Sequence, residues 1–342
     1  MDHLHTVSDD AAWAAGASVE ELEAVLSAAD DADLAMRTPP VRLSSPARPV
    51  VPGTCEITLL GALGCRYGML SGGAGGLLLR TPGGALITDP GPSALHRLLA
   101  LAAVGEFDFA EVVGIAVTHL HPDHYTDLIP CLEGAATASG RPPVILTNPT
   151  VAERFAAFSP YHQRMGSWVT LAHHETDGDG EPSIKVVDDM TVHATPALHL
   201  EETGRTHSAI GLVLDTEAGH VWYSSDTNLV DGLLDAVAAI APHPRLVIAH
   251  GDAALLHADE DRRAACHLGM RDLPVIARRL TPDALLVQHY DAAYSEPRYR
   301  HAHAEWVRRQ LAFDLASVRI LPGRDRQRLV LSTDGITDSG FC

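Results

Sequence analysis

The sequence predicts an α+β fold in which two mixed β-sheets pack face to face, with helices on their outer faces. Apolar stretches form hairpins in both halves of the chain, at residues 71–91 and 208–227, and helical stretches lie between them. The strands therefore do not alternate strictly with helices, as they would in a doubly wound parallel sheet. A chain of 342 residues, 46% of them hydrophobic, can build a substantial core.

Residues 1–52 differ from the rest and form a predicted N-terminal extension and linker. Helical spacing covers residues 18–36, and Ser18 and Glu21 form the pattern of a capping box. Residues 37–53 are rich in proline and serine, which predicts an extended segment. The domain that follows is predicted to span residues 53–342.

From Cys55 on, apolar runs bounded by Gly, Pro and Asp predict the strands. They are expected at 55–62, as a pair within 71–91, at 112–117, 144–149 and 167–174, as a pair within 183–199, as a hairpin within 208–227, and at 245–252, 283–291, 317–321 and 327–332. Helical spacing predicts helices at 93–104, 150–165, 267–280 and 303–313.

The charge balance excludes some partners. Lys plus Arg is 25 and Asp plus Glu is 44, so the formal net charge is −19. Such a surface repels nucleic-acid backbones and anionic membranes, and no run rich in Lys and Arg marks a basic groove. We therefore expect a small-molecule substrate, with neither nucleic acid nor membrane as a partner.

The cysteines and the N-terminus indicate a cytoplasmic protein. The 5 cysteines are scattered and form no CxxC pair, so a disulfide framework is not expected. The first residues show neither the basic nor the apolar region of a secretory signal, and no apolar stretch reaches transmembrane length.

Several predicted strands end in an Asp or a His. These residues are Asp89, the cluster from His119 to His124, His199, Asp226 and His289. Strand ends can converge at one rim of a sheet, and imidazole and carboxylate are ligands for zinc and related ions. His119 and His121 point the same way in extended chain and can hold one ion, while Pro122 favours a turn that directs Asp123 and His124 toward a second position.

The stretch "HLHPDH" at residues 119–124 resembles the H-x-H-x-D-H motif of the metallo-β-lactamase fold superfamily. The segments "TDPG", "ALH", "YSSDT" and "VQHYD" resemble its later landmarks in the same order, over roughly residues 54–335. The third of these has Ser225 where the family usually has glycine. The resemblance implies a four-layer αββα sandwich with metals at one rim, which agrees with the strand pattern.

The resemblance also implies the metal ligands. One ion would bind His119, His121 and His199, a second would bind Asp123, His124 and His289, and Asp226 would bridge the two. Asp89 would accept a hydrogen bond from a ligand histidine and fix its tautomer. Two divalent ions, zinc by default with manganese or iron as alternatives, would activate a bridging water as hydroxide.

Within the superfamily, the pattern is most similar to ribonuclease Z and its phosphodiesterase relatives. These enzymes carry a histidine that opens a helix and faces the scissile phosphate, which here corresponds to His267. Asp123 and His267 are thus the candidate catalytic residues, and an ordinary packing role for His267 stays open as the alternative. His250 also ends an apolar strand. Two interpretations are open, support of a ligand residue and a purely structural role, and we favour the structural one.

The resemblance implies a dinuclear metal-dependent hydrolase, most plausibly of a small phosphodiester such as a cyclic nucleotide. The long basic arm that grips transfer RNA in ribonuclease Z is not visible in the sequence. Two alternatives stay open: hydrolysis of a lactone, thioester or amide, and an iron-dependent redox or dioxygenase activity on the same scaffold. A homodimer is common in this family and is expected here.

Overall fold

The computed structural model describes residues 17–37, 46–252, 267–291 and 295–341. The chain divides into two compact units, Met1–Arg42 and Leu43–Cys342. The first contains helix α2 (Val19–Arg37), and its capping box is confirmed: Ser18 N donates to Glu21 Oε2 at 2.8 Å and Glu21 N donates to Ser18 Oγ at 3.2 Å. The domain boundary predicted at residue 52 stays a prediction.

The first sheet contains the first and last strands of the second unit. In spatial order its strands are β16 (Gly335–Phe341), β15 (Gln327–Ser332), β1 (Cys55–Leu59), β2 (Leu77–Thr81), β3 (Gly84–Thr88), β4 (Val112–Val117), β5 (Val144–Thr147) and β6 (Ser167–Thr170). The strands from β16 to β3 pair antiparallel, and those from β3 to β6 pair parallel.

The second sheet is likewise mixed. In spatial order it contains β14 (Arg319–Pro322), β13 (Ala284–Gln288), β11 (Leu246–Asp252), β10 (Gly219–Tyr223), β9 (Ile210–Thr216), β8 (Met190–Pro196) and β7 (Ser183–Val187), and the short β12 (Leu268–Gly269) pairs with β11. The strands β10, β11, β13 and β14 are parallel, whereas β7 to β10 are antiparallel.

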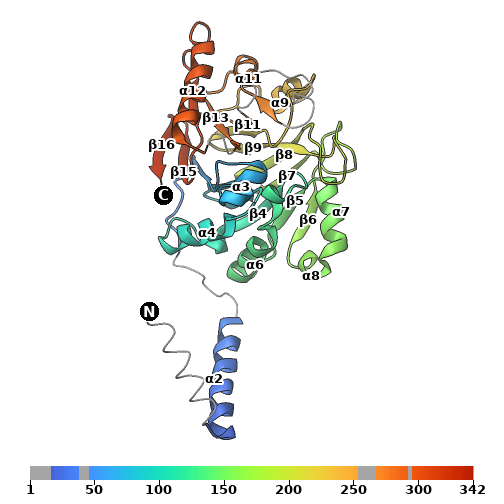
Figure 1. Ribbon diagram of the computed structural model, residues 1–342, viewed down its shortest axis with the longest axis vertical. Helices are drawn as coiled ribbons and strands as arrows, with labels where there is room; N and C mark the ends of the chain where they lie inside the picture. The colour runs from blue at the N-terminus through green and yellow to red at the C-terminus, as the bar shows by residue number, and fades with distance from the viewer. Residues whose placement is uncertain (1–16, 38–45, 253–266, 292–294, 342) are drawn as a thin grey trace. The chain divides into compact units, whose positions relative to one another are not determined.

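Helices cover both outer faces, so the predicted four-layer αββα sandwich is confirmed (Figure 1). The layer outside the first sheet contains α4 (Ala94–Ala103), η1 (Phe109–Glu111), α6 (Leu128–Ser139), α7 (Pro149–Phe158) and α8 (Pro160–Gln163). The layer outside the second sheet contains α9 (Leu233–Ile240), α11 (Asp272–Leu280) and α12 (Pro297–Leu311). The short helices α3 (Cys65–Ser71) and α5 (Pro122–Tyr125) lie at the rim that carries the candidate site.

Three layers of buried side chains hold the sandwich together. In β2, Leu77 and Leu79 face the other sheet, whereas Leu78 packs under the outer helices. In β11, Ile248 faces the first sheet and Val247 packs against α9 and α11 on the other side. Because both faces of these strands are buried, their sequences are continuous apolar runs rather than alternating ones.

The structure corrects two predicted helices and contains elements that the sequence did not predict. The helix expected at 150–165 is two helices, because Ser159 leaves the helical conformation before Pro160. The helix expected at 267–280 begins only at Asp272, so His267 does not open a helix but precedes β12. The strand β16 and the helices α6 and α9 were not predicted.

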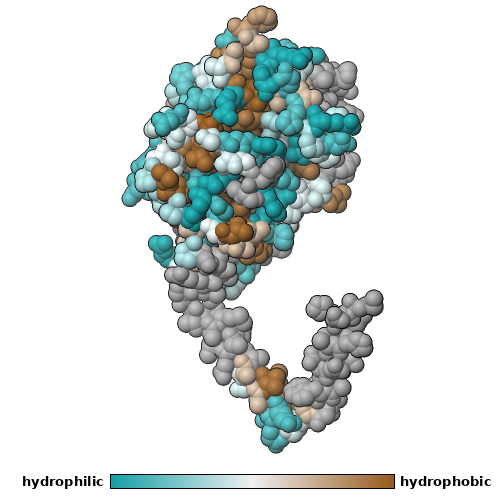
Figure 2. All heavy atoms as spheres, turned by 90° about the vertical axis from the view of Figure 1, so that its left-hand side faces the viewer, coloured by the Kyte–Doolittle hydropathy of each residue, from teal (hydrophilic) through white to brown (hydrophobic). Residues whose placement is uncertain are grey.

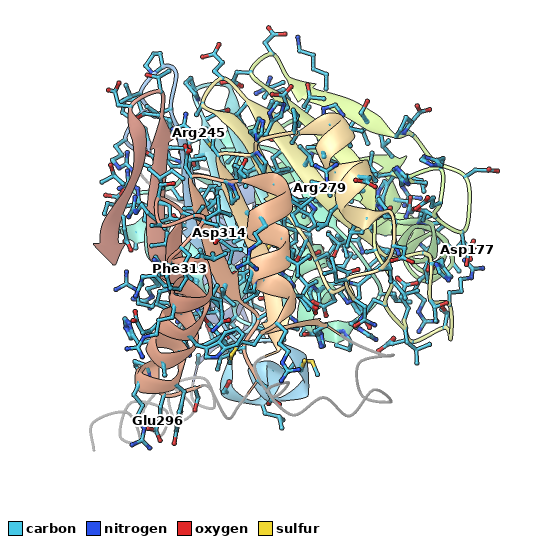
Figure 3. All side chains as sticks on the ribbon, turned by 90° about the horizontal axis from the view of Figure 1, so that it is seen from above. Asp177, Arg245, Arg279, Glu296, Phe313 and Asp314 are labelled. Carbon is cyan, nitrogen blue, oxygen red and sulfur yellow. The ribbon has the colours of Figure 1, made fainter. Side chains whose placement is uncertain are left out.

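Ion pairs connect the helices outside the second sheet. Arg279 of α11 contacts Asp235 of α9 at 2.7 Å, and Arg278 contacts Asp314, just after α12, at 2.6 Å. Figure 3 labels Arg279 and Asp314, one residue of each pair. The face drawn in Figure 2 mixes hydrophilic residues with smaller groups of hydrophobic ones.

Within the described ranges, none of the helices has the length and apolarity needed to cross a bilayer.

Gly76 forms a close contact between β2 and the end of β3. Its φ of +68° lies in the left-handed region, and a Cβ there would lie 2.0 Å from the carbonyl oxygen of Thr88 and 2.2 Å from that of Asp89. Gly53 has a similar φ of +72°, yet a Cβ at that position would meet no atom within 4 Å. The two glycines therefore separate the cost of the backbone conformation from the cost of a steric clash.

We expect Gly53→Ala to lower the free energy of unfolding by about 1–2 kcal/mol, the cost of a left-handed alanine. Gly76→Ala should lower it by about 1–3 kcal/mol more, because strand backbone must move to make room. Urea unfolding of both variants measures the difference. Equal decreases in the free energy of unfolding for the two variants would show that the backbone around Gly76 moves without added cost.

Candidate metal centre

The candidate site lies where the carboxyl ends of strands from both sheets meet. Strands β3 and β4 of the first sheet are parallel, as are β10, β11 and β13 of the second, and β8 points the same way as β10. The polar residues at these ends are Asp89, His119, His199, Asp226, His250 and His289. The first turn of α5 begins at Pro122 and brings Asp123 and His124 to the same place.

All seven predicted metal ligands lie together, in two groups that share Asp226. In the first group, His121 Nδ1 lies 3.1 Å from His119 Nε2 and 3.0 Å from His199 Nε2. Asp226 Oδ2 lies 3.5 Å from His119 Nε2 and 3.6 Å from His199 Nε2. Four ligand atoms thus surround one point.

The second group has the same spacing. His124 Nε2 lies 3.2 Å from His289 Nε2, and Asp123 Oδ2 lies 3.4 Å and 3.2 Å from these two nitrogens. The carboxylate of Asp226 approaches both histidines at 3.3 Å. Among these residues only Asp226 belongs to both groups.

The donor atoms fit divalent cations in number, type and spacing. In a tetrahedral zinc site, ligand atoms about 2.1 Å from the ion lie about 3.4 Å from one another. The spacings of 3.0 to 3.6 Å in the two groups agree with this value. Imidazole nitrogen and carboxylate oxygen suit zinc, and also manganese or iron.

Asp89 holds His124 in position, as predicted. Its carboxylate accepts hydrogen bonds from the Thr118 backbone at 2.7 Å, from the Thr118 hydroxyl at 2.7 Å and from the Tyr223 hydroxyl at 2.9 Å. Asp89 Oδ2 also lies 3.0 Å from His124 Nδ1. A proton on Nδ1 leaves Nε2 free as a ligand atom, so Asp89 selects the tautomer that can bind metal.

His250 contacts the site more directly than the sequence indicated. Its Nδ1 lies 2.7 Å from Asp226 Oδ1, and its Nε2 lies 2.8 Å from Gln288 Nε2. Its ring stacks on that of His289 at a centroid distance of 4.7 Å. Burial lowers the pKa of His250 to about 4, so the ring is neutral at pH 7 and orients Asp226 as a hydrogen-bond donor.

His267 contacts Asp226 from the segment that precedes β12. Its Nε2 is 3.0 Å from Asp226 Oδ2, and the residue is 7% exposed. Burial opposes protonation, but the carboxylate of Asp226 and a contact with Cys65 raise the pKa of His267 well above its ordinary value.

Cys65 was not predicted as a site residue. Its Sγ lies 3.8 Å from His267 Nε2, and its backbone N donates to Asp123 Oδ2 at 2.8 Å. Burial would raise the pKa of this thiol, but the charge of His289 and the neighbouring His267 lower it to about 7. No sequence pattern marked Cys65, because it is a single cysteine at the start of a short helix that was not predicted.

Glu201 is the second residue that sequence reasoning missed. It is 3% exposed and lies two residues after His199. Its carboxylate accepts from Leu120 N at 2.9 Å, from Asn148 Nδ2 at 2.6 Å and from the Ser208 hydroxyl. Leu120 lies between His119 and His121, so Glu201 connects the loop after β4 to the loop that carries His199. The role of Glu201 is visible only from its burial beside the His/Asp cluster, and the sequence does not show that burial.

Comparison with known proteins agrees with this architecture. Residues 85–290 match the family model described as the beta-lactamase superfamily domain. The uncharacterized protein MJ1374 of the archaeon Methanocaldococcus jannaschii is 25% identical over 277 residues, which cover 78% of this chain and 92% of that protein.

Solved structures share the fold at low sequence identity. The short form of human tRNase Z has a TM-score of 0.58 and 17% identity, covering 80% of this chain and 98% of its own. YhfI of Bacillus subtilis has a TM-score of 0.57 and 16% identity, covering 81% and 99%. A diphosphatase of the PhnP family has a TM-score of 0.54 and 14% identity, covering 81% and 97%.

An αββα sandwich with a His/Asp cluster at one rim defines the class of metal-dependent hydrolases with the metallo-β-lactamase fold. The match over residues 85–290 shows that this chain belongs to the beta-lactamase superfamily.

We expect Glu201→Ala to destabilise the protein by about 2–4 kcal/mol, because it leaves Leu120 N and other buried donors without their acceptor. The affinity for zinc should fall by about 10–100-fold, as it does when other partners of ligand loops are removed. Thermal unfolding and competition with a chromophoric chelator measure the two effects.

The neighbouring Glu202→Ala is the matched control, since Glu202 is exposed. It should change the free energy of unfolding by less than about 0.5 kcal/mol. Wild-type zinc affinity in Glu201→Ala would contradict the positioning role.

Proposed function

We propose that the protein is a dinuclear metal-dependent hydrolase that acts on a small phosphodiester, with zinc as the default ion. The observation that carries this proposal is the pair of ligand groups that share Asp226, each with the spacing of a cation site. His119, His121 and His199 would hold one ion, and Asp123, His124 and His289 the other.

Two divalent cations at such a site activate water and neutralise charge on the attacked group. The chain's own residues supply the rest. Asp89 and His250 fix the orientation of His124 and Asp226, so the ligand atoms are in place before a substrate arrives. Asp123 is anchored by the backbone N of Cys65, which keeps its Oδ2 directed at His124 and His289.

His267 is the proposed acid. Its Nε2 faces Asp226, and its Nδ1 finds no hydrogen-bond partner among the residues that the structure describes. A protonated imidazole at this place can donate its Nε2 proton to the oxygen of a departing alcohol. Its position before β12 instead of at a helix start does not alter this role, because the ring reaches the site from the strand end.

The choice of a phosphodiester has two supports. The solved structures of similar fold include a tRNase Z and a diphosphatase, whose names describe cleavage of phosphate esters or anhydrides. The formal net charge of −19 and the lack of a basic run in the sequence disfavour a large RNA. A small substrate of the cyclic-nucleotide type fits both.

We expect the zinc-loaded protein to hydrolyse bis-p-nitrophenyl phosphate. His121→Ala should lose bound zinc and lower the rate by at least about 100-fold, because it removes the nitrogen that lies between His119 and His199. Elemental analysis and the release of p-nitrophenolate measure the two losses in the same samples.

His301→Ala is the matched control, because His301 is exposed on α12. Its metal content and rate should equal those of the wild type. Zinc-loaded protein that cleaves lactones but no phosphodiester would contradict the substrate class, and a single iron without zinc would contradict the hydrolytic centre.

His267→Ala tests the acid separately. For phosphodiesters with an alkyl leaving group, the rate should fall by about 10²–10⁴-fold, the usual contribution of a general acid. For p-nitrophenyl esters the loss should be far smaller, because that leaving group departs without a proton. Equal losses for both leaving groups would show that His267 is not the acid.

A further inference from the structure

A third cluster of ligand atoms lies beside the two groups that share Asp226. Cys65, His267 and His289 each offer one atom, and these atoms lie within 4.8 Å of one another. Cys65 Sγ is 3.8 Å from His267 Nε2. None of the roles assigned above uses the thiol, so the cluster requires its own explanation.

The backbone conformation of Cys65 is strained. Its φ of +58° lies in the left-handed region, where glycine would avoid a strain of about 1 kcal/mol or more. Cys65 N donates to Asp123 Oδ2 at 2.8 Å, and the preceding Gly64 N donates to the carbonyl oxygen of Tyr290 at 3.0 Å. The loop is therefore tied to both α5 and the end of β13.

His289 presents its second nitrogen to the same loop. Its Nε2 faces His124 and Asp123, whereas its Nδ1 lies against Gly64, where a Cβ would come within 2.1 Å. Within the described part of the chain this Nδ1 has no hydrogen-bond partner, although the residue is only 6% exposed. A ring nitrogen of His289 lies within 4.8 Å of the Cys65 thiol, and imidazole and thiolate together are the donor types that a soft cation binds.

The spacing agrees with such a cation. Zinc binds sulfur at about 2.3 Å and nitrogen at about 2.0–2.1 Å, which places the two ligand atoms about 3.6 Å apart in a tetrahedral site. The separation of Cys65 Sγ and His267 Nε2 is 3.8 Å. We propose that Cys65, His267 and His289 form an additional site for a thiophilic divalent cation, such as cadmium or excess zinc.

Occupation of this site would inhibit the enzyme, a consequence that depends on the proposed function. A cation on His267 Nε2 takes the position of the proton that this residue would donate. Repulsion from the two neighbouring cations makes the additional site weaker than the other two, so it fills only when metal is in excess. Excess thiophilic metal is thus expected to switch off hydrolysis.

The binding test uses the full chain loaded with its two ions, to which cadmium is added. We expect one further equivalent of cadmium to bind and to produce the near-ultraviolet absorption of a cadmium–thiolate bond. Cys65→Ser should lose this absorption. Cys131→Ala should keep it, because Cys131 is fully buried in α6. Cadmium that merely replaces the ions of the His/Asp groups gives no thiolate absorption.

The proposal is overturned if the wild type shows no thiolate absorption, or if Cys65→Ser keeps it. Both results are independent of whether a phosphodiester is the substrate. With an active substrate in hand, the cadmium concentration for half-inhibition should rise at least about tenfold in Cys65→Ser, relative to that variant's own uninhibited rate. Equal sensitivity of the two proteins would refute the inhibitory role.

Discussion

One buried carboxylate organises this protein. Asp226 is 1% exposed, and its oxygens lie 2.7 to 3.6 Å from nitrogens of six histidines, namely His119, His124, His199, His250, His267 and His289. An isolated carboxylate could not be buried at this depth, because its desolvation would cost several kcal/mol. Burial raises the pKa of Asp226, but the charges of His289, His124 and His267 lower it well below its ordinary value. The histidines and the carboxylate therefore depend on one another.

The two packed sheets of the sandwich bring these groups together. Tyr223 at the end of β10 donates to Asp89 at the end of β3, a bond of 2.9 Å that joins the two sheets directly beneath the site. Positive φ values at Asp89, Ser225 and His289 turn the chain sharply as it leaves its strands, and each costs about 1–3 kcal/mol. Strands buried on both faces supply the rigidity that offsets this strain. The ligand geometry is thus a property of the whole fold.

The sequence predicted the layers from its apolar runs, and the resemblance of its motifs to a known family named the seven residues that the structure brings together in two groups. Sequence analysis missed the features that arise from contacts between segments far apart in the chain. β16 has two glycines and lacks a continuous apolar run, and it is a strand because β15 pairs with it. Glu201, Cys65 and the contact of His250 with Asp226 appear only when distant segments meet. The break before Pro160 is different, because the proline itself is a local signal for the end of a helix.

The pairing of β1 with β15 has a consequence for how the chain is made. Cys55 lies opposite Leu331, so β1, an interior strand of the first sheet, pairs on one side with a strand that is synthesised long after it. Until then one hydrogen-bonding edge of β1 is open, and open edges invite pairing with other chains. Contacts between such distant residues also slow folding. During translation, this edge of β1 therefore stays open until β15 has been synthesised, and removal of β15 would leave an aggregation-prone edge.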